Sequence, residues 1–267
     1  MQQGLRLARA AFSTIQGNAL TAIQQKTTKV ALVTGGSGGI GSEIARRLAI
    51  DGFAVMIAYS KSAEAAEKIL HAIAQAGGET ALVRADVSNA KDVQEAFDAT
   101  INRFGRIDVL VNNAGVIAPG MIADVIEDTY DTVFDVNVRG ALLAMREAAK
   151  RLQDGGRVIN ISSTLVGAPI PGSALYAASK AALEAFSRVL SKEIGPRGIT
   201  VNTLRLGATI PGMFAKAPPE RQAAFAAASP FKRLGTPQDA AEAVSFLASE
   251  GGRWVTGQVI TVDGGAT

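Results

Sequence analysis

The sequence of 267 residues contains no cysteine and only one histidine, His71. Without cysteine there is no disulfide, no thiolate nucleophile and no cysteine-ligated zinc. A lone histidine, which we expect to face solvent on a surface helix, does not make a metal site either. We therefore expect no metal, which argues against a metal-dependent alcohol dehydrogenase. The lack of cysteine fits a reducing compartment, and we expect a cytoplasmic protein.

Long apolar runs are also missing: none approaches the ~20 residues that a membrane span requires. Apolar residues nevertheless make up 48% of the chain, enough for a substantial core. We therefore expect no membrane association, and a large folded domain instead.

Acidic residues are absent from the N-terminal segment, where Glu43 is the first carboxylate. Residues 1–29 hold four bases, Arg6, Arg9, Lys26 and Lys29, and without them the net charge of +3 becomes about −1. The basic pI of 9.3 thus reflects a leader rather than a nucleic-acid surface, and we expect no nucleic-acid partner. Residues 1–28 form an N-terminal extension outside the core: a mobile tail, the product of a start codon placed too far upstream, or an organelle transit peptide.

From Lys29 onward, short β-branched runs alternate with longer helical segments. This alternation predicts one α/β domain over residues 29–267, a doubly wound Rossmann fold whose seven-stranded parallel sheet has helices on both faces. The expected strands are 30–33, 54–59, 81–84, 109–111, 157–161, 199–204 and 259–262. The expected helices are about 40–50, 62–76, 90–103, 128–152, 174–193 and 237–248.

A glycine-rich turn separates the first predicted strand from the first predicted helix. Glycine lets the backbone adopt positive φ and approach a phosphate closely, and the helix that follows presents unpaired N–H groups. A merely tight structural turn is the alternative, but its position favours dinucleotide binding. The expected cofactor contacts here are Gly35, Ser37, Gly39, Ile40 and Gly41.

The end of the second strand indicates which nicotinamide cofactor is bound. An acid there would hold the adenosine ribose of NADH, but the chain reads Tyr59, Ser60, Lys61, with no carboxylate before Glu64. Ser60 and Lys61 suit a 2′-phosphate, which favours NADPH. The alternative is a solvated turn lysine and an NADH enzyme.

Two further segments fall at strand ends. Asp86 and Val87 follow the third strand, where we expect the adenine. Asn113, Ala114 and Gly115 end the fourth strand at the switch point, where such sheets bind ligands. We expect both segments to contact the cofactor, although an Asn-Ala-Gly turn also occurs for structural reasons.

Tyr176 and Lys180 lie four residues apart on one predicted helix and therefore share a face. A free phenol near pKa 10 is a poor acid at neutral pH, and a neighbouring cation stabilises its phenolate. Ser163, at the end of the fifth strand, can hydrogen-bond a carbonyl oxygen as charge develops there. Tyr-x-x-x-Lys alone is common on surface helices, but with the phosphate turn it indicates general acid–base catalysis.

These motifs, together with Asp135–Val138, Val158–Ser163, Pro230–Gly235 and Thr256–Gly265, resemble the classical short-chain dehydrogenase/reductase family from about Lys29 to Gly265. The resemblance implies that Tyr176 donates the proton and that Lys180 lowers its pKa and binds the nicotinamide ribose. It implies that Ser163, rather than Ser162, orients the carbonyl, and that Asn137 supports a water-mediated proton path to Lys180. It also implies a homotetramer, or a dimer.

One stretch departs from the family pattern, which usually reads Pro-Gly followed by a threonine that touches the carboxamide. Here Leu206 replaces the proline before Gly207, and Pro211 stands where the threonine is expected. We expect Gly207 and Thr209 to contact the cofactor instead, at the start of a substrate loop over about 207–231.

The expected activity is interconversion of a carbonyl and an alcohol by hydride transfer, on an aldehyde, ketone or 3-oxoacyl group with an apolar body. The chain resembles 3-oxoacyl carrier-protein reductases and NADPH-dependent aldehyde reductases equally. Lys150, Arg151 and Arg197 could attract an acidic carrier protein, or be ordinary helix-end charges. A catalytically silent NADP(H)-sensing regulator is a further alternative, although it has no need to keep Ser163 and Tyr176 together.

Overall fold

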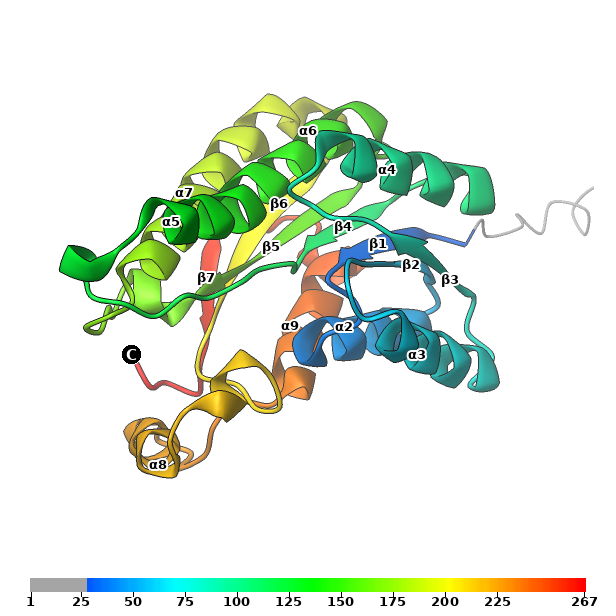
Figure 1. The fold of residues 1–267 in the computed structure, drawn as a ribbon. Helices are drawn as coiled ribbons and strands as arrows, with labels where there is room; N and C mark the ends of the chain where they lie inside the picture. Colours follow the sequence, from blue (N-terminus) through cyan, green and yellow to red (C-terminus); the bar gives the residue numbers. More distant parts are fainter. Residues whose placement is uncertain (1–27) are drawn as a thin grey trace, which may run out of the picture.

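The computed structural model describes residues 28–267, so the predictions for the N-terminal leader lie outside the described residues. The fold is built on a sheet of seven parallel strands in the order β3-β2-β1-β4-β5-β6-β7, which confirms the predicted doubly wound architecture (Figure 1). Strands β1 to β3 are added towards one side and β4 to β7 towards the other, so the strand order reverses between β1 and β4, near the centre of the sheet. The strands are β1 Val30–Thr34, β2 Ala54–Tyr59, β3 Thr80–Arg84, β4 Val109–Asn112, β5 Arg157–Ser163, β6 Thr200–Leu206 and β7 Val259–Val262.

Helices cover both faces of the sheet, which explains why the central strands are apolar throughout rather than alternating (Figure 1). On one face lie α2 (Gly39–Ile50), α3 (Ala63–Gln75) and α9 (Pro237–Ala248). On the other lie α4 (Ala90–Phe104), α6 (Ala141–Arg151) and α7 (Ala174–Glu193), with α5 (Glu127–Phe134) beside α7. Each face has its own apolar core, and together the two cores hold the sheet rigid.

The helix predicted over 128–152 is divided into α5, a π-helical segment at Asp135–Gly140, and α6. Two contacts account for the segment. Asn137 is buried within it, and a Cβ on Gly140 would lie 2.8 Å from Val87 Cγ2. Widening the turn places the Asn137 side chain inside the domain, and π-turns of this kind recur at functional sites.

A short helix, α8 (Pro219–Ala228), was not predicted. None of its residues is buried, so it has no apolar stripe to mark it in the sequence. It lies within the expected substrate loop and extends away from the sheet (Figure 1). Within residues 28–267, no helix combines the length and apolar character needed to cross a bilayer.

Candidate active site

The glycine turn holds β1 and α2 in a conformation that side chains would prevent. Gly35 has φ +62°, and a Cβ on Gly41 would lie 2.3 Å from the Gly35 carbonyl oxygen. Helix α2 begins at Gly39 with no side-chain cap and no acid in its first turn. Its first backbone N–H groups therefore remain available to an anion.

Thr34 and Asn113 fasten this turn to the end of β4. The Asn113 and Ala114 amides donate to Thr34 Oγ1 at 3.0 and 3.1 Å. Asn113 Nδ2 donates to the carbonyl oxygens of Thr34 and Gly35, both at 3.0 Å. Sequence analysis missed Thr34 as an organising residue, although a threonine closing the first strand was the available signal.

The end of β2 opens into a hollow of about 450 Å³ lined by Lys61, Ser62, Glu64 and Lys68, among others. Lys68 pairs with Glu64 at 2.6 Å. Lys61 is exposed and has no ion-pair partner within the described part of the chain, while Tyr59 and Ser60 are partly buried beside it. The one unpaired cation of this hollow is thus the residue expected to meet a 2′-phosphate.

Asp86 and Val87 lie after β3, as expected, but they differ in surroundings. The Asp86 carboxylate accepts hydrogen bonds from Ser88 N and Oγ at 3.0 and 2.7 Å, and it remains exposed. Val87 is half-buried against Gly140. Of these two side chains, Asp86 is the polar and exposed one.

Ser163, Tyr176 and Lys180 come together where β5 ends beneath α7. Tyr176 is hydrogen-bonded to Ser163, whose Oγ also accepts from the Leu165 amide at 3.2 Å. Lys180 Nζ lies 5.7 Å from the centre of the Tyr176 ring and donates to the Ile161 carbonyl oxygen at 2.9 Å. The three residues expected to act together are therefore adjacent in space.

Burial controls the ionisation of both titratable groups. It raises the pKa of Tyr176 to about 12, and the hydrogen bond to Ser163 opposes this only in part. It lowers the pKa of Lys180 to about 8, because the buried ammonium has lost its water. Burial and the hydrogen bond to Ser163 account for the pKa of Tyr176, and Lys180 is not among the causes. The expectation that Lys180 lowers the pKa of Tyr176 stays a prediction.

Asn137 also lies close to Lys180. Its Oδ1 accepts from the Val116 amide at 2.8 Å, and its Nδ2 donates to the Val116 carbonyl oxygen at 2.8 Å and to Ser179 Oγ at 3.0 Å. A Cβ on Gly115 would be 3.2 Å from Asn137 Oδ1 and 3.3 Å from Lys180 Nζ. Gly115 thus keeps open the small space that these two polar groups border.

The stretch that departs from the family pattern folds back against the cofactor turn. The Gly207 amide donates to the Val262 carbonyl oxygen at 3.0 Å, and Thr209 Oγ1 donates to the Gly207 carbonyl oxygen at 3.0 Å. The Thr209 hydroxyl proton is thus used within the loop. The Pro211 carbonyl oxygen would be 2.8 Å from a Cβ on Gly39, so this loop rests directly on the start of α2.

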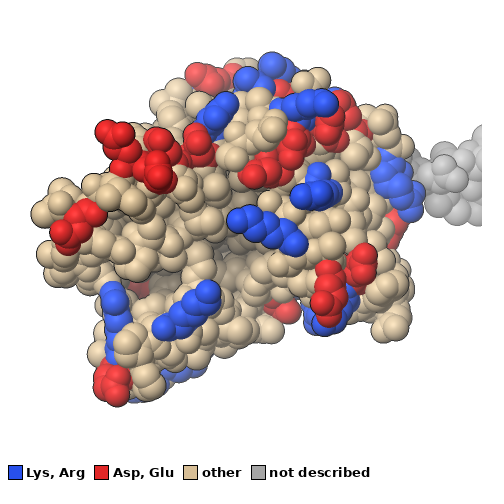
Figure 2. All heavy atoms as spheres, in the orientation of Figure 1, with Lys and Arg blue, Asp and Glu red and all other residues tan. Residues whose placement is uncertain are grey.

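Figure 2 shows a hollow in the middle of one face, between the projecting part that carries α8 and the rest of the domain. Basic and acidic side chains are interspersed around it rather than separated by sign. The apolar residues Met213 and Phe231, which flank α8, are 49% and 70% exposed.

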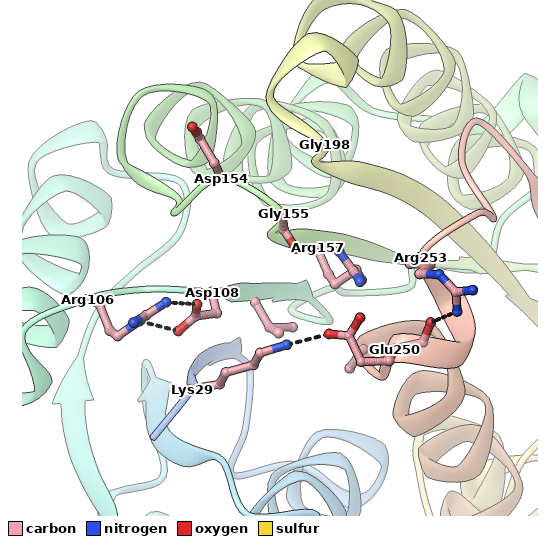
Figure 3. Close-up of a pocket in the computed structure, with 11 residues that line it drawn as sticks. Lys29, Arg106, Asp108, Asp154, Gly155, Arg157, Gly198, Glu250 and Arg253 are labelled. Carbon is pink, nitrogen blue, oxygen red and sulfur yellow. Dashed lines mark hydrogen bonds and ion pairs between the residues drawn. The ribbon is translucent and has the colours of Figure 1, made fainter. Parts of the chain in front are cut away.

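A second cavity, of about 290 Å³, lies at the opposite, amino-terminal edge of the sheet (Figure 3). It is lined by ion pairs, including Lys29–Glu250 at 2.9 Å and Arg106–Asp108 at 2.6 Å. None of the expected site residues borders it. Among residues 28–267 no three His, Asp or Glu side chains cluster as a metal site.

Comparison with known proteins agrees with this geometry. A family model described as enoyl-(acyl carrier protein) reductase matches residues 35–267. An uncharacterized oxidoreductase of Methylorubrum extorquens is 46% identical over 89% of this chain and 97% of its own. A versicolorin reductase of Emericella nidulans is 39% identical over 89% and 95%.

Among solved structures, a short-chain dehydrogenase of Burkholderia cenocepacia in complex with NADP has a TM-score of 0.86 and 39% identity, over 91% of this chain and 99% of that one. The chain therefore belongs to the short-chain dehydrogenase/reductase family and is an oxidoreductase of the classical type.

Proposed function

We propose that the protein is an NADPH-dependent reductase of aldehydes or ketones that have an apolar body. The observation that carries this proposal is the convergence of Ser163, Tyr176 and Lys180 at the carboxyl edge of the sheet. Asn113, which follows β4 at the same edge, hydrogen-bonds the glycine turn, and Gly115 lies against Lys180. The bound nicotinamide, as hydride donor, and Tyr176, as proton donor, would then meet at one point.

The residues present fit a dinucleotide phosphate. A Cβ on Gly35 would collide with Ala114, and one on Gly41 with the Gly35 carbonyl oxygen, so this tight turn requires glycine. The uncapped start of α2 offers N–H groups to the pyrophosphate. Exposed, unpaired Lys61 supports NADPH over NADH, as does the similarity to a structure in complex with NADP. When bound, the reduced nicotinamide supplies hydride to the carbonyl carbon.

The chain's own residues bind the substrate's carbonyl oxygen and protonate it. Ser163 Oγ donates a hydrogen bond to the carbonyl oxygen, and the Tyr176 hydroxyl gives it a proton as negative charge develops. With its pKa raised to about 12, Tyr176 is protonated throughout the physiological range and ready to donate. An alkoxide is about as basic as hydroxide, whose conjugate acid has pKa about 15.7, so this transfer is downhill. Cationic Lys180 stabilises the phenolate that remains.

The walls of the site support an apolar substrate. Phe214 and Phe225 pack with their rings tilted by 55° and their centres 4.9 Å apart in the segment that includes α8, and Met213 is half-exposed next to Phe214 in the chain. Leu165 and Val166, two and three residues after Ser163, are partly buried. A substrate between these segments would lose water from its apolar part and keep its carbonyl at Ser163.

A 3-oxoacyl carrier-protein reductase is the less favoured alternative. Arg151 already pairs with Asp98 and Glu147, and Arg197 pairs with Asp154 at 2.8 Å. Both bases follow helices that lead into strands, at the amino-terminal edge of the sheet, far from Tyr176. An acidic carrier held there could not deliver its acyl group to the catalytic edge.

Exposed apolar residues support the homotetramer expected from the resemblance. Ile126 and Tyr130 at α5 and Val189 on α7 are 63%, 45% and 57% exposed, while Trp254, between α9 and β7, is 94% exposed. Two separate apolar regions suit the two interfaces of a tetramer. Light scattering after size-exclusion chromatography tests this, and a monomer at micromolar concentration would refute it.

The proposed activity is tested by following loss of NADPH absorbance with a panel of aldehydes, ketones and a 3-oxoacyl thioester. We expect turnover of carbonyls with aromatic or long aliphatic bodies, and faster turnover with NADPH than with NADH. If NADPH binds but no carbonyl in the panel is reduced, the sensing alternative is favoured.

A further inference from the structure

Helix α7 carries a second buried charged residue, Glu184, on the stripe of Tyr176 and Lys180. Glu184 follows Lys180 by four residues and is 2% exposed. A lysine and a glutamate at this spacing normally attract one another on a helix. Here they do not pair: Lys180 Nζ donates to the Ile161 carbonyl oxygen instead.

Glu184 is instead fully engaged by two neighbouring strands. Arg205 Nε and Nη2 donate to its Oε1 and Oε2, both at 2.7 Å. Ser162 Oγ also donates to Oε1, at 2.8 Å. A bidentate guanidinium–carboxylate pair of this kind is the strongest and most directional that side chains form.

Arg205 connects this pair to the surroundings of the catalytic serine. It lies opposite Ser162 in the β5–β6 register and directly before Leu206, where the family proline is missing. A Cβ on Gly167 would lie 3.2 Å from Arg205 Nη1, so the loop after Ser163 also rests on the guanidinium.

We propose that Arg205 is a positioning residue for Lys180: by holding the Glu184 carboxylate, it leaves the Lys180 ammonium on the Ile161 carbonyl oxygen, beside Tyr176. The inference rests on the proposed reductase function, whereas the contacts of Arg205, Glu184 and Lys180 do not depend on the substrate.

Removing the guanidinium would leave a buried carboxylate without a cation. The groups around Lys180 are Tyr176 on α7, Asn137 and Ser179, none of which is charged, together with the Ile161 carbonyl on β5. On α7, Glu184 is then the one carboxylate within four residues of Lys180. The ammonium would turn towards it and away from the phenol, because an unpaired buried anion is costly.

The experiment compares Arg205→Met, Glu184→Gln and the double variant, using a carbonyl that the wild type reduces. For Arg205→Met we expect kcat to fall about tenfold to a hundredfold, with KM changed by less than about threefold, because a displacement near 1 Å costs this much. Glu184→Gln should remain within about threefold of wild type, since Arg205 is partly solvated and tolerates losing its partner. The double variant should recover most of the kcat that Arg205→Met loses.

Recovery of kcat in the double variant distinguishes a positioning role of Arg205 from a purely stabilising one. If the pair only held the fold together, removing both partners would be at least as damaging as removing Arg205. Arg205→Lys should rescue in part, and Arg205→Gln replaces Arg205→Met should that variant not fold. A double variant no better than Arg205→Met overturns the inference.

A second readout does not depend on activity. The side-chain nitrogen resonance of Lys180, assigned by its loss in Lys180→Met, is followed by NMR as a function of pH. We expect its titration midpoint to rise in Arg205→Met and to return in the double variant; no movement overturns the inference.

Arg106→Met is the matched control, because it removes the guanidinium from another buried carboxylate, Asp108, at the far edge of the sheet (Figure 3). It should leave the Lys180 midpoint unchanged. Should the wild type reduce no carbonyl, the proposed function fails, while the Lys180 titration still decides whether Arg205 positions the ammonium.

Discussion

The two edges of the sheet treat charge in opposite ways. At the amino-terminal edge, Lys29, Arg106 and Arg197 each have a carboxylate partner within 3 Å. At the carboxyl edge, Lys180 is buried and its hydrogen bond is to a neutral carbonyl. These three cations of the amino-terminal edge are neutralised, although buried Arg157 in the same cavity bonds only carbonyl oxygens. At the carboxyl edge, the cation beside the phenol is left without a carboxylate.

This difference indicates that the buried Lys180 ammonium lowers the stability of the fold at the site proposed for the reaction. A paired ion holds its ordinary charge and adds modestly to stability. A buried ammonium without a carboxylate is destabilised, which is why the pKa of Lys180 falls to about 8. The low local dielectric that destabilises the buried ammonium also strengthens its attraction to a phenolate as the negative charge develops. The predictions that follow test this contrast.

The largest effect is expected at the proton donor. Tyr176→Phe removes the hydroxyl and nothing else, so kcat should fall about a thousandfold, within the range for general acid catalysis. NADPH binding, followed by fluorescence titration, should remain within about twofold of wild type. A variant that keeps a tenth of wild-type kcat would show that another group delivers the proton.

Lys180→Met should lower kcat about a hundredfold and also weaken NADPH binding. In the wild type, the reductive rate should decline as pH rises through about 8, because Lys180 is charged below its pKa and neutral above it. Tyr176 remains protonated to about pH 12 and does not cause that decline. The pH–rate profile of Lys180→Met should therefore lack the limb near pH 8; an unchanged limb would assign it to another group.

At the amino-terminal edge of the sheet, removing an ion pair should lower the stability of the fold rather than kcat. Arg106→Met leaves Asp108 buried without its guanidinium, while the carboxylate still accepts from the Val30 amide at 2.8 Å. We expect the free energy of unfolding in urea to fall by about 2 kcal/mol, less than for a fully buried pair because Arg106 is partly exposed. A large fall in kcat for the folded variant would contradict the division between the two edges.

The smallest expected effect concerns cofactor choice. Lys61→Ala should lower kcat/KM for NADPH about tenfold and leave that for NADH unchanged, since only the former carries a 2′-phosphate. Lys68→Ala is the control, because Lys68 lines the same hollow but is paired with Glu64. Equal effects of the two substitutions would indicate general attraction rather than a specific contact.

Most of the fold was predictable because the strands are buried on both faces and their apolar runs are separated by turns. The predicted strands Ala54–Tyr59 and Val259–Val262 match β2 and β7, and the prediction for α7 is equally close. Two elements were not predicted for opposite reasons. Helix α8 buries nothing, so it has no periodicity, whereas the π-turn at Asn137 depends on a distant contact between Gly140 and Val87.

The candidate site was likewise predictable only in part. Spacing alone placed Tyr176 and Lys180 on one face of a helix, and the glycine pattern located the turn. The partners of Asn113 and Glu184 were hidden, because Thr34 lies 79 residues from the former and Arg205 lies 21 residues from the latter. No local pattern predicts a hydrogen bond between two segments that the fold alone brings together.

The sequence by itself determined the class of fold, the glycine turn and the spacing of Tyr176 and Lys180 on which the proposed catalysis rests, because each is encoded in a local repeat, a turn or a helical spacing. The tertiary structure decided the ionisation of the catalytic groups and which carboxylate meets which cation. Those depend on how much water the packed domain removes, and desolvation is a property of the whole environment rather than of neighbours in the chain.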